Sequence, residues 1–436
     1  MTSEFTDAAA LDLAAYIRSG DTVAWGQACA EPLTLTELLA AQRARLGSVR
    51  CFTGISTLSA VRPELCDHLS FASYCAAGAN RALAEAGVLD ILPCHYSELP
   101  RILGYGPLQV SVLLLALAPS GPDGTFGLGL GADYVATLIG RARVVIAEVN
   151  EQVPDVGGDR RLSRDDIDVI VHTSRPPAEY PEAAPRDIES VIAGHVASLV
   201  PDGATIQLGL GSMPAAVARR LRDHRDLGVH SGVITDAVAE LIEAGVVTGA
   251  RKSIDRGLTV AGFLMGTKHL ITRAAADRSI QLRDTNYTHD PAVLAGQQHL
   301  VAINSATEVD LTGQVNSETV AGRYVGAVGG ATDFLRGAAR SDGGIPVIVL
   351  PSTAGSSTGG SSTAGSSTAG TSRIVARLSG PASQARADAG VIVTEYGIAD
   401  LRGLTLSQRR ERMVVISHPD HRAALEAEAH RAASAD

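Results

Sequence analysis

The sequence has few aromatic residues, few cysteines and no long apolar run. Aromatic side chains make up 4% of the 436 residues, whereas hydrophobic residues as a whole make up 45%. A composition dominated by small and aliphatic residues is typical of a soluble α/β protein and excludes a fibrous or disordered chain. The longest apolar run, residues 110–118, is far shorter than the roughly 20 residues needed to cross a bilayer. We therefore expect no membrane span.

Positive charge is also scarce. The chain has 37 Lys and Arg against 47 Asp and Glu, which gives a formal net charge of −10. Without a Lys/Arg-rich run, nothing offsets the repulsion from nucleic-acid phosphates, so the composition argues against a general nucleic-acid binder. The N-terminus is acidic and lacks a signal-like apolar core, which favours a cytoplasmic location.

The cysteine and histidine patterns do not predict a metal site. The sequence contains no Cys-x-x-Cys spacing, no His-Glu-x-x-His motif and no Cys/His cluster. The cysteines are odd in number and confined to the first quarter of the chain, and we expect buried free thiols. They are Cys29, Cys51, Cys66, Cys75 and Cys94.

Apolar, strand-like runs alternate with helix-like segments along the chain. Residues 109–118, 143–148 and 205–208 read as buried strands, and residues 188–199 as a helix. This alternation predicts an α/β fold built from parallel βαβ units, with binding sites beyond the carboxyl ends of the strands.

Two segments break the pattern. The proline-rich stretch 174–187 predicts a boundary between a first domain of residues 1–186 and a second of residues 187–436. Residues 352–372 are only Ser, Thr, Ala and Gly, which cannot build a core and predict a flexible loop.

A carboxylate follows one of the predicted strands. Residues 300–303 read as a buried strand and residues 312–314 as a turn, so Glu308 and Asp310 lie near a strand end and, if the strand persists, share a face. A carboxylate shielded on one side and open on the other suits a nucleophile. Glu395 lies in a similar position, and a solvated or ion-paired strand-end charge is the more common role for either glutamate.

Glycine pairs mark possible ligand loops. Gly209 and Gly211 follow a predicted strand, where missing side chains let backbone N–H groups approach an anion. Pro214 stands where Gly-x-Gly-x-x-Gly needs its last glycine, so a plain tight turn before a helix competes with an anion site.

Several ordered blocks of the sequence carry a family resemblance. The main ones are residues 209–214, 227–231, 302–316, 329–334, 350–354 and 393–399. Together they resemble the acetyl-CoA hydrolase/transferase family, which includes acetate, succinate and 4-hydroxybutyrate CoA-transferases. The resemblance runs from about residue 11 to about residue 428. It implies two CoA-transferase-like α/β domains with open, mostly parallel sheets and an active site between them.

The resemblance also implies a reaction. Glu308 would attack an acyl-CoA thioester to give an acyl-glutamyl anhydride and CoA thiolate, and the thiolate would then form a glutamyl-CoA thioester. Gly329 and Gly330 resemble the family's Gly-x-Gly-Gly loop and, with Gly209 and Gly211, would contact the pantetheine or the oxyanion.

The chain departs from the family pattern in that loop, where Ala327 stands in place of a glycine and Ala331 in place of a glutamine. Lys252 and Lys268 are candidate contacts for the CoA phosphates, with solvated surface lysines as the alternative.

The resemblance implies acyl-CoA and small carboxylic acids as substrates, no permanently bound cofactor and a homodimer. Acyl-CoA hydrolysis and acyl-CoA binding without turnover stay open as alternatives to CoA transfer.

Overall fold

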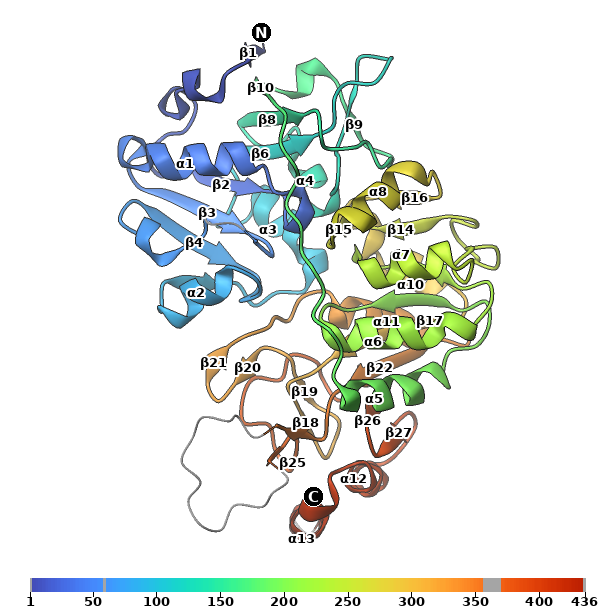
Figure 1. Ribbon diagram of the computed structural model, residues 1–436. Helices are drawn as coiled ribbons and strands as arrows, with labels where there is room; N and C mark the ends of the chain where they lie inside the picture. Colours follow the sequence, from blue (N-terminus) through green and yellow to red (C-terminus); the bar gives the residue numbers. More distant parts are fainter. Residues whose placement is uncertain (1, 58–59, 356–369, 434–436) are drawn as a thin grey trace.

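A computed structural model describes residues 2–57, 60–355 and 370–433. The chain forms two large open sheets with helices packed against them (Figure 1). The first sheet is entirely parallel and takes its eight strands from residues 3–173. In spatial order they are β1 (Ser3–Phe5), β10 (Val169–Thr173), β8 (Val144–Asn150), β6 (Val112–Leu117), β2 (Thr22–Trp25), β3 (Val49–Thr53), β4 (Leu69–Ser73) and β5 (Leu89–Ile91).

The second sheet is parallel except for its last strand, which pairs antiparallel with its neighbour. Its order is β12 (Gly228–Val229), β11 (Thr205–Leu208), β17 (Leu300–Ser305), β22 (Ile345–Val349), β26 (Val391–Thr394) and β27 (Gly397–Asp400). The predicted α/β class and the mostly parallel sheets are confirmed.

The helices follow the strands as the alternating pattern predicts. In the first half they are α1 (Leu33–Leu46), α2 (Asn80–Glu85), α3 (Leu99–Tyr105) and α4 (Asp133–Leu138). In the second half they are α5 (Asp187–Ala197), α6 (Ser212–Arg220), α7 (Asp236–Glu243), α8 (Lys268–Ala276), α9 (Thr285–Thr288), α10 (Pro291–Gly296), α11 (Ala331–Arg340), α12 (Leu406–Val415) and α13 (Pro419–Ala433).

The strands are buried because their sequences are apolar on both faces. All seven residues of β8 are buried, and β6 is buried at all but one position. Near-continuous apolar runs are typical of parallel strands covered on both sides by other elements. One hydrophobic cluster contains residues of both sheets, from Ala24 in β2 to Val393 in β26, so the two halves share a core.

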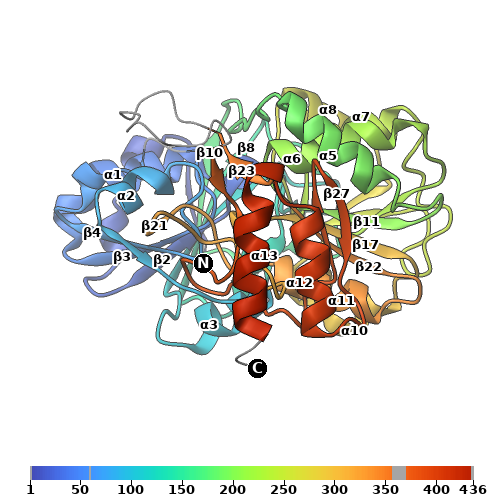
Figure 2. The same cartoon turned by 90° about the horizontal axis from the view of Figure 1, so that it is seen from below.

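An extended connection without regular secondary structure links the halves. It covers the proline-rich stretch and runs along the molecule from β10 to the start of α5 (Figure 1). At the far end of the chain, α12 and α13 pack together (Figure 2). No helix in the described ranges is both long and apolar enough to cross a membrane.

The predicted loop at residues 352–372 is described only at its ends. Two short strands, β23 (Thr353–Ala354) and β24 (Thr371–Ser372), pair antiparallel there. Residues 356–369 lie outside the described residues, so the prediction of a flexible loop is untested.

All five cysteines are free. Cys29, Cys51 and Cys75 are buried as expected, whereas Cys66 and Cys94 are only half-buried.

Candidate active site

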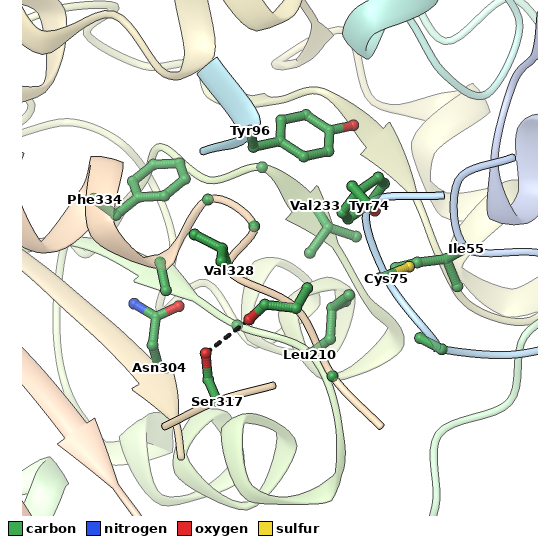
Figure 3. Close-up of a pocket in the computed structure, with 18 of the residues that line it drawn as sticks. Ile55, Tyr74, Cys75, Tyr96, Leu210, Val233, Asn304, Ser317, Val328 and Phe334 are labelled. Atoms are coloured by element: carbon green, nitrogen blue, oxygen red, sulfur yellow. Dashed lines mark hydrogen bonds between the residues drawn. The ribbon is translucent and has the colours of Figure 1, made fainter. Parts of the chain in front are cut away.

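A cavity of about 260 Å³ lies where the two halves of the chain meet. Both halves contribute to its wall, and most of the side chains that line it are apolar (Figure 3). Its lining comprises Ile55, Tyr74, Cys75, Ala77, Tyr96, Gln207, Leu208, Gly209, Leu210, Gly232, Val233, Phe263, His289, Asn304, Ser305, Ser317, Gly326, Ala327, Val328, Gly329, Gly330, Ala331 and Phe334.

The cavity lies at the carboxyl ends of parallel strands. Ile55 follows β3, Tyr74 follows β4, Gly209 follows β11, and Ser305 is the last residue of β17. Ligands of open α/β sheets bind at this edge, because the loops there are free to carry specific groups while the strands hold them in place. The cavity therefore lies at the edge of both sheets where the alternating pattern predicts binding sites.

A glycine-rich loop, residues 326–330, closes one side of the cavity. The backbone N–H of Ala76 donates to the Gly326 carbonyl at 3.1 Å, and that of Tyr96 donates to the Gly329 carbonyl at 3.0 Å. Ser317 Oγ donates to the Ala327 carbonyl at 2.7 Å (Figure 3). The bonds from Ala76 and Tyr96 fix the loop against the first half of the chain, and the bond from Ser317 fixes it within the second half.

Two glycines of this loop are required by its geometry. Gly329 has φ of +55°, a backbone conformation that side-chain-bearing residues adopt at a cost. A Cβ on Gly330 would come within 2.7 Å of His289 Nε2. The resemblance singled out both positions, and the structure places both in the cavity wall.

The amino end of α11 also faces the cavity. Its N-cap residue, Gly330, has no side-chain cap, so the first N–H groups of the helix have no partner from a capping side chain. Ser97 Oγ donates to Asp333 Oδ1 at 2.8 Å and anchors this turn to the first half. Such a helix end attracts negative charge, including the charge that develops on a thioester oxygen under attack.

The opposite wall is held by a buried amide. Tyr74 Oη donates to Gln27 Oε1 at 2.8 Å, and Gln27 Nε2 donates to Tyr96 Oη at 2.5 Å and to Asp133 Oδ2 at 2.8 Å. Gln27 and Asp133 are almost fully buried. Burial raises the pKa of Asp133 to about 6, and it raises the pKa of both tyrosines well above the ordinary value.

His289 lies between the two walls. Its ring stacks near Tyr96 and Phe334, with both centroid distances 4.8 Å, and its Nδ1 is 2.9 Å from Thr288 Oγ1. Burial lowers the pKa of His289 to about 3, so the imidazole is neutral near pH 7. Gly232, whose Cβ would approach this ring at 3.3 Å, leaves open space beside it.

Glu308 does not line this cavity. Strand β17 ends at Ser305, and the chain then enters β18 (Glu308–Asp310), which belongs to a separate small sheet with β19 (Val315–Asn316) and β25 (Ile374–Val375). The Glu308 carboxylate is half-exposed and accepts hydrogen bonds from Ser379, at 2.7 Å from the backbone N–H and 3.0 Å from Oγ.

Asp310 holds the turn that follows β18. Its Oδ1 accepts from the backbone N–H groups of Thr312 and Gln314 at 2.8 and 3.0 Å. The Asp310 carboxylate is therefore engaged in hydrogen bonds within the protein.

Two residues of the same segment do reach the cavity, and the sequence reasoning did not single them out. Asn304 and Ser305 end β17, and Asn304 Nδ2 donates to Gln207 Oε1 at 2.9 Å. The available signal was their position, since they are the first polar residues after an apolar strand.

Of the other predicted site residues, some line this cavity and some lie elsewhere. Gly209 lines the cavity, whereas Gly211 is the N-cap of α6 with φ of +105° and is not part of the lining. Lys268 begins α8 and lines a second cavity of about 450 Å³ with Pro176, Pro177 and Glu179.

Lys252 is not a surface residue. It is 3% exposed, and its Nζ donates to the Val229 and Leu258 carbonyls at 3.0 and 2.8 Å. Burial lowers its pKa to about 8. The alternative of a solvated surface lysine is therefore wrong for Lys252, because its ammonium holds two backbone segments together.

The cavity wall in the described part of the chain contains no Asp, Glu, Lys or Arg. The described residues also contain no group of three His, Cys, Asp or Glu side chains that could hold a metal ion. The arrangement offers backbone donors, neutral polar groups and aromatic rings.

Comparison with known proteins identifies this scaffold. Residues 2–178 match the acetyl-CoA hydrolase/transferase N-terminal domain, and residues 266–429 match the C-terminal domain of the same name. The chain is 37% identical over 350 residues to the 4-hydroxybutyrate coenzyme A transferase of Clostridium kluyveri, covering 80% of this chain and 79% of that protein. The chain belongs to the acetyl-CoA hydrolase/transferase family.

Other members of this family are similar along almost the whole chain. The butyryl-CoA:acetate CoA-transferase of Anaerostipes caccae is 32% identical, covering 95% of this chain and 94% of that one. The crystal structure of RipA from Yersinia pestis superimposes with a TM-score of 0.89 at 32% identity, covering 98% and 97% of the two chains. The relatives named as CoA-transferases support an enzyme of that type.

Proposed function

We propose that this protein moves CoA between an acyl-CoA and a small carboxylic acid of the acetate, propionate, butyrate or 4-hydroxybutyrate type. The observation that carries the proposal is a cavity between the two halves, at the carboxyl ends of both sheets, on the scaffold of a family whose relatives are named CoA-transferases. The acyl group and thioester would occupy this cavity.

The cavity suits thioester chemistry in three respects. The uncapped amino end of α11 and the loop before it offer backbone donors, which stabilise a developing oxyanion by roughly 3 kcal/mol each at such sites. The largely apolar lining suits a reactive anhydride, which must be shielded from water. The neutral His289 ring adds a polar group without a buried charge.

In the proposed double displacement, a glutamate carboxylate attacks the thioester carbonyl, forming a C–O bond and releasing CoA thiolate. The thiolate attacks the glutamyl carbonyl of the anhydride, which releases the acid and leaves a glutamyl-CoA thioester. An incoming carboxylate reverses both steps. Because one thioester replaces another, no external energy source is needed.

Glu308 is the carboxylate that the family resemblance assigns to this role. Its oxygens are held by Ser379 outside the cavity lining, so catalysis through Glu308 requires the carboxylate to leave Ser379 and turn toward the thioester. Glu395 provides a matched comparison, because it also follows a strand and accepts hydrogen bonds from a serine, Ser352, at its backbone N–H and Oγ.

The mass of the intact protein tests the assignment. With butyryl-CoA and no acceptor, the wild-type protein and Glu395→Gln should gain the mass of a CoA thioester, and Glu308→Gln should not. An adduct that persists in Glu308→Gln, or CoA transfer by that variant at the wild-type rate, contradicts the role of Glu308 and leaves transfer itself intact.

One observation favours a second candidate function. No carboxylate lines the cavity in the described part of the chain, so an acyl-CoA bound there has no adjacent glutamate. Hydrolysis by water, or binding without turnover, needs none. CoA release measured with and without added acetate separates the three: release that depends on acetate supports transfer, release without any acid supports hydrolysis, and saturable binding without release supports a binder.

A further inference from the structure

The cavity wall carries aromatic and aliphatic side chains together with neutral polar groups, and no charged side chain among the described residues. We infer that the acyl group bound here is uncharged and apolar, and that the mono-CoA thioesters of dicarboxylic acids are poor substrates. This inference rests on the proposed function and specifies its substrate class.

The tyrosine hydroxyls do not offer a polar site for the acyl group. Tyr74 Oη donates to Gln27, and Tyr96 Oη accepts from Gln27, so both hydroxyls are engaged behind the wall. The rings are 5.2 Å apart in an edge-to-face arrangement and line the cavity. The surface they present to a ligand is therefore apolar.

The charge behind the wall has the wrong sign for an acidic ligand. Asp133 is 1% exposed and bonded to the same Gln27, and Glu318, 4% exposed, accepts hydrogen bonds from Tyr324 and Ser383 at 2.7 and 2.6 Å. A second carboxylate on the substrate would lose its hydration without gaining a cation. An unpaired buried charge costs several kcal/mol.

His289 does not compensate for such a charge. It is 4% exposed, is packed between Tyr96 and Phe334, and is neutral near pH 7 because burial disfavours its protonated form. Among the other polar groups, Gln207 and Asn304 hydrogen-bond to each other across the strand ends, and Ser317 Oγ donates to the Ala327 carbonyl. Ser305 also lines the cavity and is uncharged. These groups can support the thioester region but cannot neutralise a carboxylate.

The size of the cavity fits short acyl chains. Its volume of about 260 Å³ lies just below the roughly 300–1,000 Å³ of pockets that hold drug-sized ligands. Butyryl and succinyl groups both have four carbons, so they test charge at nearly constant size. The 4-hydroxybutyryl group adds a polar but uncharged end.

The test compares kcat/KM for CoA transfer to acetate from butyryl-CoA, 4-hydroxybutyryl-CoA and succinyl-CoA, using the full-length protein. We expect succinyl-CoA to be at least about 100-fold worse than butyryl-CoA, with 4-hydroxybutyryl-CoA between them. If turnover is absent, the dissociation constants of the same three thioesters should rank in the same order.

Succinyl-CoA that equals or exceeds butyryl-CoA overturns the inference and leaves the proposed function intact. Failure to bind or turn over any acyl-CoA contradicts the proposed function as well.

A charge introduced into the wall provides an independent test. Val328 lines the cavity and is half-buried, so a lysine there can place its ammonium near the acyl end. Val328→Lys should raise the succinyl-CoA to butyryl-CoA ratio of kcat/KM at least about 10-fold, whereas Val328→Met should leave the ratio unchanged. A ratio that moves equally in both variants, or in neither, contradicts charge as the basis of the preference.

Discussion

The two walls of the cavity are built by different means. The wall from the first half places aromatic rings in front of a buried polar hub, Gln27, which satisfies Tyr74, Tyr96 and Asp133. The wall from the second half is a glycine-rich loop and a helix end that bring backbone to the surface. On the proposed function, the first wall would set the shape and polarity of the acyl site, and the second would supply hydrogen-bond donors for the thioester.

The largest effect should come from adding a methyl group to the second wall. In Gly330→Ala the new Cβ meets His289 Nε2 at 2.7 Å, so the loop or the ring must move out of place. We expect kcat/KM for CoA transfer to fall on the order of 100-fold, about 3 kcal/mol in transition-state binding.

Gly194→Ala is the matched control for that change. Gly194 lies within α5, and a Cβ there meets nothing within 4 Å. It should keep wild-type activity and gain stability, because alanine favours helix. Equal losses in the two variants would show that the effect is not local to the cavity.

Removing the hub of the first wall should act mainly on stability. Gln27→Leu leaves Tyr74 and Asp133 without their amide partner in a buried site. Each unsatisfied buried group costs about 1–3 kcal/mol, so urea unfolding should show a loss of roughly 3 kcal/mol. Gln207→Leu, which breaks only the pair with Asn304, should cost less. The reverse order would contradict the role of Gln27 as the hub.

The smallest effect concerns the ring between the walls. The pKa of His289 is lowered to about 3 by burial, so below pH 6.5 the unfolded chain binds a proton that the folded chain does not. This contribution to stability is present above about pH 6.5 and is lost as the pH falls toward 3.

Relative to His289→Gln, the wild-type protein should lose about 1 kcal/mol of unfolding free energy between pH 6.5 and 5.5. Other titrating groups occur in both proteins and cancel in the comparison. Parallel stability curves for the two proteins would show that the imidazole is accessible to protons in the folded state.

The sequence predicts the scaffold well because the scaffold depends on local patterns. The apolar runs at residues 109–118, 143–148 and 205–208 became β6, β8 and β11, and the helix predicted at 188–199 became α5. Gly209, Gly329 and Gly330 are also recognisable from the sequence, and all three line the cavity.

The walls of the cavity depend on contacts between residues far apart in the chain. Local sequence patterns do not predict such contacts. Gln27 and Asp133 are separated by 106 residues, and Asn304 and Gln207 by 97. Strand-end position alone could not distinguish Asn304 from Glu308, because the turn from β17 into a separate sheet decides which side chain faces the cavity. The burial of Lys252 is a tertiary effect of the same kind.

The most direct measurement is a crystal structure of the protein with butyryl-CoA. We predict that the acyl chain lies against Tyr74, Tyr96 and Phe334, with the thioester oxygen near the backbone of Gly329 and Gly330. The assignment of this cavity as the acyl site would be contradicted if the acyl chain bound elsewhere, such as in the cavity beside Lys268, and left the space between the two walls empty.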